Sequence, residues 1–171
     1  MKKFLSLIFV AAFFFSAKYG VAQETKFKAM YLYNFTKQIG WPPTAKTGDF
    51  VIAVLGNSPI YNTLCQMTAG KQAGNQKIVV KKYNSVEEIK SAHMVFVSNS
   101  KASTANMEAL MSILENKNTL VVTEKNEYIK KGATINFTIE GEQMRFELSK
   151  ANALKHGLQI SSSLEKLAIE A

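Results

Sequence analysis

Few side chains in this sequence are of the types that catalyse reactions or bind metals. The histidines, His93 and His156, are 63 residues apart, and the single cysteine is Cys65. No C-x-x-C or H-E-x-x-H spacing occurs, so the ligand pattern of a metal site is missing. No G-x-S-x-G elbow occurs either, and a serine triad would have to recruit Asp49, the only aspartate. We therefore expect no catalytic residue, no metal and no cofactor.

Two nucleotide or phosphate sites typical of parallel α/β domains are also missing from the pattern. A dinucleotide site needs G-x-G-x-x-G after the first strand. That turn reads Leu55-Gly56-Asn57-Ser58-Pro59, with one glycine. A phosphate-accepting receiver domain needs acidic residues at strand ends, whereas Asp49 precedes the first expected strand. The residues at these positions therefore argue against both a dinucleotide site and a receiver domain.

Two polar loops that follow expected strands remain as candidates for a ligand site. Each loop leads into an expected helix, whose N-terminus could hold an anion. In open α/β sheets, ligands bind beyond the carboxyl ends of the strands, where the strand order switches. The candidate ligand-binding residues are Gly56, Asn57, Ser58, Ser98, Asn99 and Lys101. Polar helix caps would have the same composition, so that interpretation stays open beside the functional one.

The beginning of the chain has the pattern of an export signal. Lys2 and Lys3 precede an apolar run over residues 4–15, and Gly20-Val21-Ala22 is a small-residue cleavage site. The apolar run is shorter than the ~20 residues that a membrane-spanning helix needs. We expect residues 1–22 to be a cleaved signal peptide and residues 23–171 to form a single exported domain.

Charge and cysteine content narrow the class of partner. The chain has 21 basic and 13 acidic residues, a net charge of +8, and three of the lysines lie in the predicted signal peptide, which leaves +5. The remaining lysines are scattered and Arg145 is the only arginine, whereas nucleic-acid surfaces cluster these residues. We expect no nucleic-acid partner. Cys65 cannot form a disulfide within one chain, so it is either a buried thiol or a potential bridge to another chain, and its helical apolar setting favours burial.

Elements that could position these residues alternate along the chain. A helix is expected over 24–39, and apolar runs predict strands at 50–55, 77–81, 94–97 and 119–123. Between them the pattern predicts a helix over 59–68, a short helix opened by a Ser85 and Glu88 capping box, and a helix carrying Met107, Leu110, Met111 and Leu114. Three crossovers of this length imply parallel strand pairing.

Toward the end of the chain, the spacing of apolar residues changes from that of helices and buried strands to strict alternation. Apolar residues alternate over 133–139 and 144–148 around a glycine-bearing turn, which predicts an antiparallel hairpin. A short helix ends at Gly157, and a last amphipathic helix is expected to carry Ile160, Leu164, Leu167 and Ala168. The predicted fold class is α/β: a three-layer domain with a mostly parallel sheet from β-α-β units and a C-terminal antiparallel hairpin.

Several segments, in this order, resemble the YfiR family of bacterial periplasmic proteins. They are KAMYLYNFTKQIGWP, VIAVLGNSP, HMVFVSNS, LVVTEK and GATINFTIEGEQMRFELSKANALKHGLQISSSLEKLA, of which the last is the most specific. The resemblance implies a homodimeric periplasmic regulator without a catalytic residue. It would repress an inner-membrane diguanylate cyclase by binding its periplasmic part, lowering cyclic-di-GMP and biofilm formation. The alternative is a periplasmic small-molecule binding or sensor module without a cyclase partner.

The resemblance also suggests a role for the first expected helix, which is apolar on more than one side. Leu32, Phe35 and Ile39 form one stripe that can face the sheet. The candidates for a partner or dimer interface are Phe27, Met30, Tyr33 and Trp41. Neighbouring helices that cover both apolar sides are the alternative. With Cys65 alone, the redox-sensitive disulfide pairing of some relatives cannot form within one chain.

Overall fold

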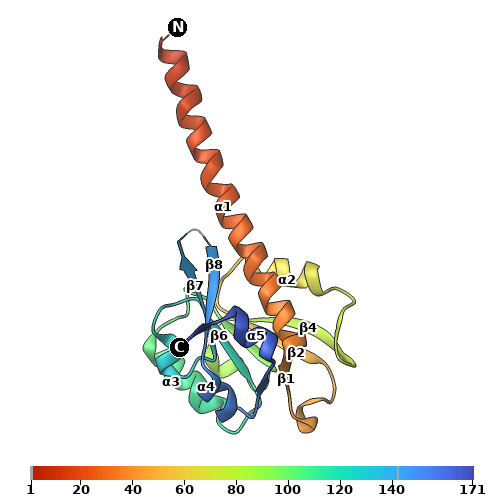
Figure 1. Ribbon diagram of the computed structural model, residues 1–171. Coiled ribbons are helices and arrows are strands. Elements are labelled where there is room, and N and C mark those ends of the chain that lie inside the picture. The colour runs from red at the N-terminus through yellow and green to blue at the C-terminus, as the bar shows by residue number, and fades with distance from the viewer. Residues whose placement is uncertain (1, 142) are drawn as a thin grey trace.

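The computed structural model describes residues 2–141 and 143–171, and for residues 2–19 it describes the backbone alone. Within these residues, one sheet has the strand order β10-β8-β7-β6-β5-β2-β4-β3 (Figure 1). Its strands are β2 (Phe50–Leu55), β3 (Gln72–Ala73), β4 (Gln76–Tyr83), β5 (Met94–Val97), β6 (Leu120–Thr123), β7 (Ile135–Glu140), β8 (Gln143–Leu148) and β10 (Ile169–Glu170). The helices are α1 (Lys2–Gln38), α2 (Ile60–Thr68), α3 (Thr104–Ile113), α4 (Lys150–Lys155) and α5 (Ser162–Leu167).

The central strands pair in parallel, as the crossover lengths predict. β4, β2, β5, β6 and β7 form parallel neighbours, and β10 adds in parallel to β8. β7 and β8 are the antiparallel pair of the predicted hairpin, with Phe137 opposite Phe146. β3 pairs with β4 in the antiparallel direction. The mostly parallel sheet and its C-terminal hairpin are therefore confirmed.

Buried apolar side chains form one cluster on each face of the sheet. Ile52 and Val54 of β2 belong to the cluster that also contains buried residues of α1 and α2, whereas Ala53 and Leu55 belong to the cluster that contains α3. This alternation arises because successive side chains of a strand point to opposite faces. The three-layer arrangement of helix, sheet and helix is confirmed (Figure 1).

Helix α1 packs with its second half on the sheet, and its beginning projects beyond the rest of the molecule (Figure 1). The predicted stripe is buried: Leu32 and Phe35 are fully inaccessible and Ile39 is nearly so. The helix ends at Gln38 because Ile39 and Gly40 form strand β1, which pairs with β9 (Gln159–Ile160). The predicted cleavage site lies inside α1, and the signal peptide stays a prediction. Among the described residues, the helices lack the combination of length and apolarity that crossing a bilayer requires.

Two short elements differ from the sequence predictions. The helix expected after Ser85 is a single 3₁₀ turn, η2 (Val86–Glu88), and the Ser85 side chain makes no capping bond. The predicted capping box does not form, because Glu88 Oε2 accepts the N–H of Asn84, the residue before Ser85, at 3.3 Å. The turn is short because Ile89, which follows it, is fully buried and extended.

The last predicted helix is shorter than its apolar pattern suggests. Ile160 belongs to β9 and Ala168 is extended, so helix α5 spans Ser162–Leu167, and Leu167 is exposed. The pairing of Ile160 with Ile39 overrides the local helical period. The Cys65 thiol is also less buried than predicted, since the residue is only partly covered on α2. The other 3₁₀ turns are η1 (Pro43–Ala45) and η3 (Tyr128–Lys131).

Candidate functional site

An apolar groove lies between the second half of α1 and the tip of the β7–β8 hairpin. It has a volume of about 610 Å³ and is lined by Gly20, Gln23, Glu24, Phe27, Met30, Tyr31, Ile139, Gln143 and Met144. Phe27 and Met30 are each 41% exposed, and Ile139 is 63% exposed. We refer to these nine residues as the α1–hairpin groove. Large apolar side chains that gather around one hollow are typical of a binding surface.

Aromatic contacts hold α1 against the hairpin below this groove. The Tyr31 ring meets the Phe146 ring edge to face, with centroids 5.4 Å apart, and lies 6.0 Å from the Phe137 ring. Phe35 meets Phe146 in the same geometry, also at 5.4 Å. Such pairs contribute about 0.5–1.5 kcal/mol beyond the burial of their area. They fix the wall of the groove while Phe27, one turn before Tyr31, remains in water.

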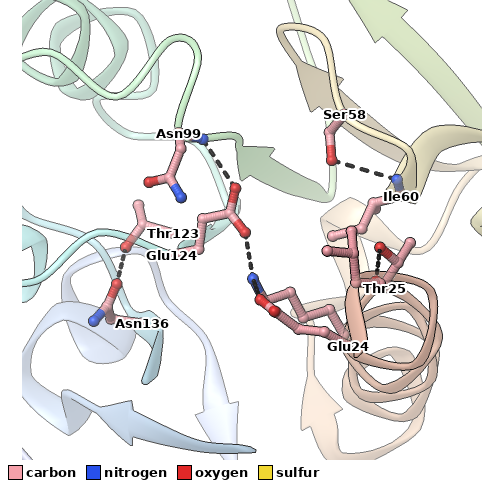
Figure 2. A network of polar contacts seen from close by, with 10 residues as sticks. Glu24, Thr25, Ser58, Ile60, Asn99, Thr123, Glu124 and Asn136 are labelled. Carbon is pink, nitrogen blue, oxygen red and sulfur yellow. Dashed lines mark hydrogen bonds and ion pairs between the residues drawn. The ribbon is translucent and has the colours of Figure 1, made fainter. Parts of the chain in front are cut away.

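A buried charge cluster closes the inner end of the groove. Lys28 is only 8% exposed, and its Nζ lies 2.6 Å from a carboxylate oxygen of Glu24 and 2.6 Å from one of Glu124. The other oxygen of Glu124 accepts the Asn99 N–H at 2.9 Å. Figure 2 shows Glu124 between Asn99 and α1. We call Glu24, Lys28 and Glu124 the Lys28 cluster, because the ammonium ties α1 to the end of β6.

The electrostatics of the cluster favour the charged lysine. Burial by itself lowers the pKa of Lys28, because a charged group is less stable away from water. Hydrogen bonds and charge attraction from Glu124 and Glu24 outweigh burial, so the pKa of Lys28 lies above its ordinary value of 10.5. The ammonium therefore stays protonated under physiological conditions and holds both carboxylates.

A polar pocket of about 360 Å³ adjoins the groove. It is lined by Glu24, Lys28, Asn99, Glu124, Asn126, Phe137, Thr138, Ile139 and Met144, and it shares Glu24, Ile139 and Met144 with the α1–hairpin groove. Nearby, Thr123 Oγ1 donates to Asn136 Oδ1 at 2.8 Å (Figure 2), and Asn136 Nδ2 donates to Glu147 Oε2 at 2.9 Å. The surface is thus apolar on its outer side and charged on its inner side.

The two strand-end loops that the sequence singled out do come together. Ser98 Oγ donates to the Leu55 carbonyl at 2.8 Å, and the Asn57 N–H donates to Ser100 Oγ at 3.1 Å. Gly56 has a φ of +93°, and a Cβ at this position would lie 2.5 Å from Ser98 Oγ and 2.6 Å from Lys101 Cγ. The chain's own atoms fill the space between the loops.

The remaining loop candidates are engaged within the protein as well. Ser58 Oγ accepts the N–H of Ile60 at 3.3 Å (Figure 2), and Asn57 Oδ1 accepts a bond from Lys82 Nζ at 3.1 Å. The Asn99 N–H is bonded to Glu124. These contacts are what polar caps make, and they leave the ligand interpretation of the loops as a hypothesis.

The four interface candidates on and after α1 separate into two groups. Phe27 and Met30 line the groove. The half-buried Tyr33 ring lies beneath the ammonium groups of Lys37 and Lys71, 4.4 and 4.6 Å from its centroid. Trp41 is 7% exposed and lies in the core, where its Nε1–H donates to the Asn118 carbonyl at 3.0 Å. An interface at this surface therefore has Phe27 and Met30 as its members from the predicted set.

The histidines are bonded to backbone groups. His93 Nδ1 accepts the Val51 N–H at 3.1 Å, and its Nε2 lies 2.7 Å from the Ala45 carbonyl oxygen. His156 Nδ1 lies 3.0 Å from the Lys117 carbonyl oxygen. In the part of the chain that the structure describes, no three His, Cys, Asp or Glu side chains are grouped so that they could hold a metal ion.

Sequence reasoning missed the hairpin half of the groove and the partner of Lys28. Ile139 and Met144 lie in the two arms of the predicted hairpin, but no local pattern indicates that α1 leaves Ile139 exposed. The Glu24 and Lys28 spacing of four residues is visible in the sequence as a helical ion pair. Glu124 lies 96 residues beyond Lys28, and no local pattern connects them.

Comparisons with known proteins agree with this architecture. A family model described as YfiR/HmsC-like matches residues 25–169. The crystal structure of a conserved domain protein from Vibrio cholerae O1 biovar El Tor is similar with a TM-score of 0.52 at 12% identity, over 71% of this chain and 54% of that one. The chain thus spans about half the length of that protein, and the likeness concerns the fold. No curated protein matches the chain at a significant level.

Proposed function

The chain belongs to the YfiR/HmsC-like family, and from this membership we propose that it represses a membrane-bound signalling enzyme by binding that enzyme's periplasmic part. Members of this family are in general periplasmic regulators. The partner that we propose is a diguanylate cyclase, so that binding lowers cyclic-di-GMP and biofilm formation. In this proposal the protein acts by contact and carries out no catalysis.

The α1–hairpin groove is the observation that carries the proposal. Phe27 and Met30 stay exposed on α1 although that helix buries Leu32 and Phe35 completely, and Ile139 stays exposed beside them on β7. Burial of each large apolar side chain contributes about 1.5–3 kcal/mol, so a partner that covers three of them gains affinity from the hydrophobic effect. The Lys28 cluster keeps this half of α1 on the sheet, so that the groove is formed before a partner arrives.

Export is the second part of the proposal. The signal peptide predicted over residues 1–22 would deliver the protein to the periplasm, where the extracytoplasmic part of an inner-membrane protein is accessible. Most of the groove residues, from Gln23 onward, follow the predicted cleavage site. Cleavage would therefore leave its apolar side chains on the mature protein.

Capture of the partner from membranes tests this function. Cells expressing the protein are cross-linked, and the proteins recovered with it are identified by mass spectrometry. We expect a membrane signalling enzyme, and we expect Phe27→Glu and Met30→Glu each to lower its recovery about tenfold or more, because a buried carboxylate opposes apolar contact. Cellular cyclic-di-GMP should rise in the same variants.

Leu154→Glu is the matched control, because Leu154 is also an exposed apolar residue, 76% accessible, but lies on α4 outside the groove. This variant should capture the partner as the wild type does. Equal capture by Met30→Glu, Phe27→Glu and wild type would exclude the groove as the contact. Gel filtration of the same variants tests the predicted homodimer, since loss of dimer without loss of partner would assign the groove to self-association.

A further inference from the structure

Strand β4 leaves most of its outer edge uncovered. Its outer neighbour, β3, pairs only with Gln76 and Lys77. The Ile78 N–H also bonds outward, to the Lys71 carbonyl at 3.1 Å. Beyond Ile78, the structure pairs β4 on its inner side alone, with β2. An open strand edge offers a row of backbone donors and acceptors to another strand.

The direction of these backbone groups follows from two hydrogen bonds. The Gly56 N–H donates to the Tyr83 carbonyl at 2.8 Å, so Tyr83 is bonded on the β2 side, whereas the Ile78 N–H points to the outer side. Because peptide groups of a parallel strand alternate between its two neighbours, the N–H and C=O groups of Val80 and Lys82 point outward. Across the described residues, no hydrogen bond reaches these groups from the outer side. We call this open stretch of the strand, with the outward N–H and C=O groups of Val80 and Lys82, the β4 edge.

The side chains at the β4 edge are apolar at its centre and basic around it. Ile78 is buried and Val80 is partly buried in the core beneath α2. Lys77, Lys81 and Lys82 are exposed. Lysines at an open edge oppose uncontrolled pairing between copies of a protein.

A second copy of the chain is a poor occupant of this edge. Antiparallel pairing in which Val80 of one copy and Lys82 of the other exchange their outward backbone hydrogen bonds would place Lys81 directly opposite Lys81 of the other copy. Like charges that face each other across strands are destabilising. The same lysines attract a strand of opposite charge, so the electrostatics select an acidic occupant.

We propose that the β4 edge binds an extended acidic segment of another protein as an added strand. Main-chain bonds to Val80 and Lys82 supply affinity, as in other cases of strand addition. Acidic side chains of the segment pair with Lys77, Lys81 and Lys82 and supply specificity. β4 lies near one end of the strand order and the β7–β8 hairpin lies near the other (Figure 1). This proposal is therefore independent of the α1–hairpin groove.

Amide hydrogen exchange on the purified protein tests the edge itself. In the free protein, the Val80 and Lys82 amides should exchange on the order of 100-fold faster than the Val79 and Lys81 amides, which are bonded to β2. The probe is a blocked peptide of alternating valine and glutamate, and its counterpart has lysine in place of glutamate. The glutamate probe should slow exchange at Val80 and Lys82, and added salt should weaken its binding.

A charge reversal supplies the matched control. Lys77→Glu with Lys81→Glu should transfer the preference to the lysine probe without unfolding the protein, because both side chains are exposed. The same change in charge by Lys130→Glu with Lys166→Glu, on η3 and α5, both exposed and away from β4, should leave the preference for the glutamate probe. The proposal is wrong if the Val80 and Lys82 amides are already protected in the free protein. It is also wrong if the glutamate probe fails to protect them at its highest soluble concentration, or if both probes protect them equally.

Discussion

Lys28 shows how one polar residue organises an otherwise apolar helix surface. Its neighbours on the buried side of α1 are Ala29 and Leu32, both fully inaccessible. An unpaired ammonium in such a position would be strongly unfavourable. Two carboxylates satisfy it, and one of them, Glu124, is itself 11% exposed in its side chain and is held by a backbone N–H. The cluster therefore stabilises one position of α1, since sliding the helix would separate Lys28 from Glu124.

Removing the Lys28 ammonium should reveal how much the Lys28 cluster contributes to the free energy of unfolding. Lys28→Met replaces the unbranched stem of the side chain but leaves Glu124 without its cation, so we expect a loss of about 3 kcal/mol in the free energy of unfolding. Urea denaturation followed by circular dichroism measures it. Glu24→Gln is the control, because Glu24 is 40% exposed in its side chain, and a loss of about 0.5 kcal/mol is expected. Similar losses in the two variants would contradict the special position of Glu124.

Single residues were predictable where the pattern is local. The buried stripe of Leu32, Phe35 and Ile39 follows from helical spacing alone, and the structure buries all three. Trp41 could not be assigned in this way, because its burial depends on Phe50, whose ring it meets at 4.9 Å, and on the carbonyl of Asn118. Contacts between distant segments decide such positions.

At the scale of elements, the turn after β2 depends on a glycine, Gly56, that contacts the loop after the neighbouring strand β5. Gly56 adopts a left-handed φ of +93° and leaves no space for a Cβ beside Ser98 and Ser100. Its N–H also bonds to Tyr83, at the end of β4. This single residue thus joins the ends of three neighbouring strands.

Substitution of this glycine should therefore disturb the sheet. Gly56→Ala should lower the free energy of unfolding by about 3 kcal/mol, because left-handed strain is combined with steric overlap. Gly74→Ala separates the two causes, since Gly74 has a φ of +59° and no atom within 4 Å of an added Cβ. A loss of about 1 kcal/mol is expected there. If thermal or urea unfolding gives equal losses for both variants, contact with the Ser98 loop is not the reason.

Strands with continuous apolar runs were the elements that the sequence predicted best. The strands expected at 50–55 and 94–97 have the same bounds in the structure, because residues buried on both faces leave little ambiguity. Elements of two residues, such as β1, β9 and β10, contain too few positions to show any period. Their pairing arises from the fold around them and in turn shortened the last helix.

At the scale of the whole molecule, the order of crossovers was enough to predict three layers, whereas the groove was not predictable. The groove exists because α1 continues past the sheet while the β7–β8 hairpin also extends beyond it (Figure 1). Neither extension is encoded in the period of its own segment. The depth and lining of a surface between two elements depend on their relative lengths.

Stability of the whole protein should respond to alkali through Lys28. The folded-state pKa of Lys28 is raised above 10.5, so its stabilising contribution is complete below the unfolded value and is lost as pH rises through the folded one. The difference in unfolding free energy between wild type and Lys28→Met should be constant near about pH 9 and shrink above about pH 11. Urea denaturation of both proteins at each pH measures this difference. Because both proteins contain the other lysines, the effect of titrating those lysines cancels in the difference. A difference that persists unchanged would show that the stability does not depend on the charge of Lys28.

The stacking of Tyr31 and Phe35 on Phe137 and Phe146 has a consequence for biosynthesis. The ribosome completes α1 roughly 100 residues before the hairpin strands that receive it, an interval on the order of ten seconds. During that time the aromatic face of the helix has no native surface to rest on. The aromatic contacts of the helix can therefore form only once the hairpin strands have been made, so docking of Tyr31 and Phe35 on the hairpin is a late step of folding.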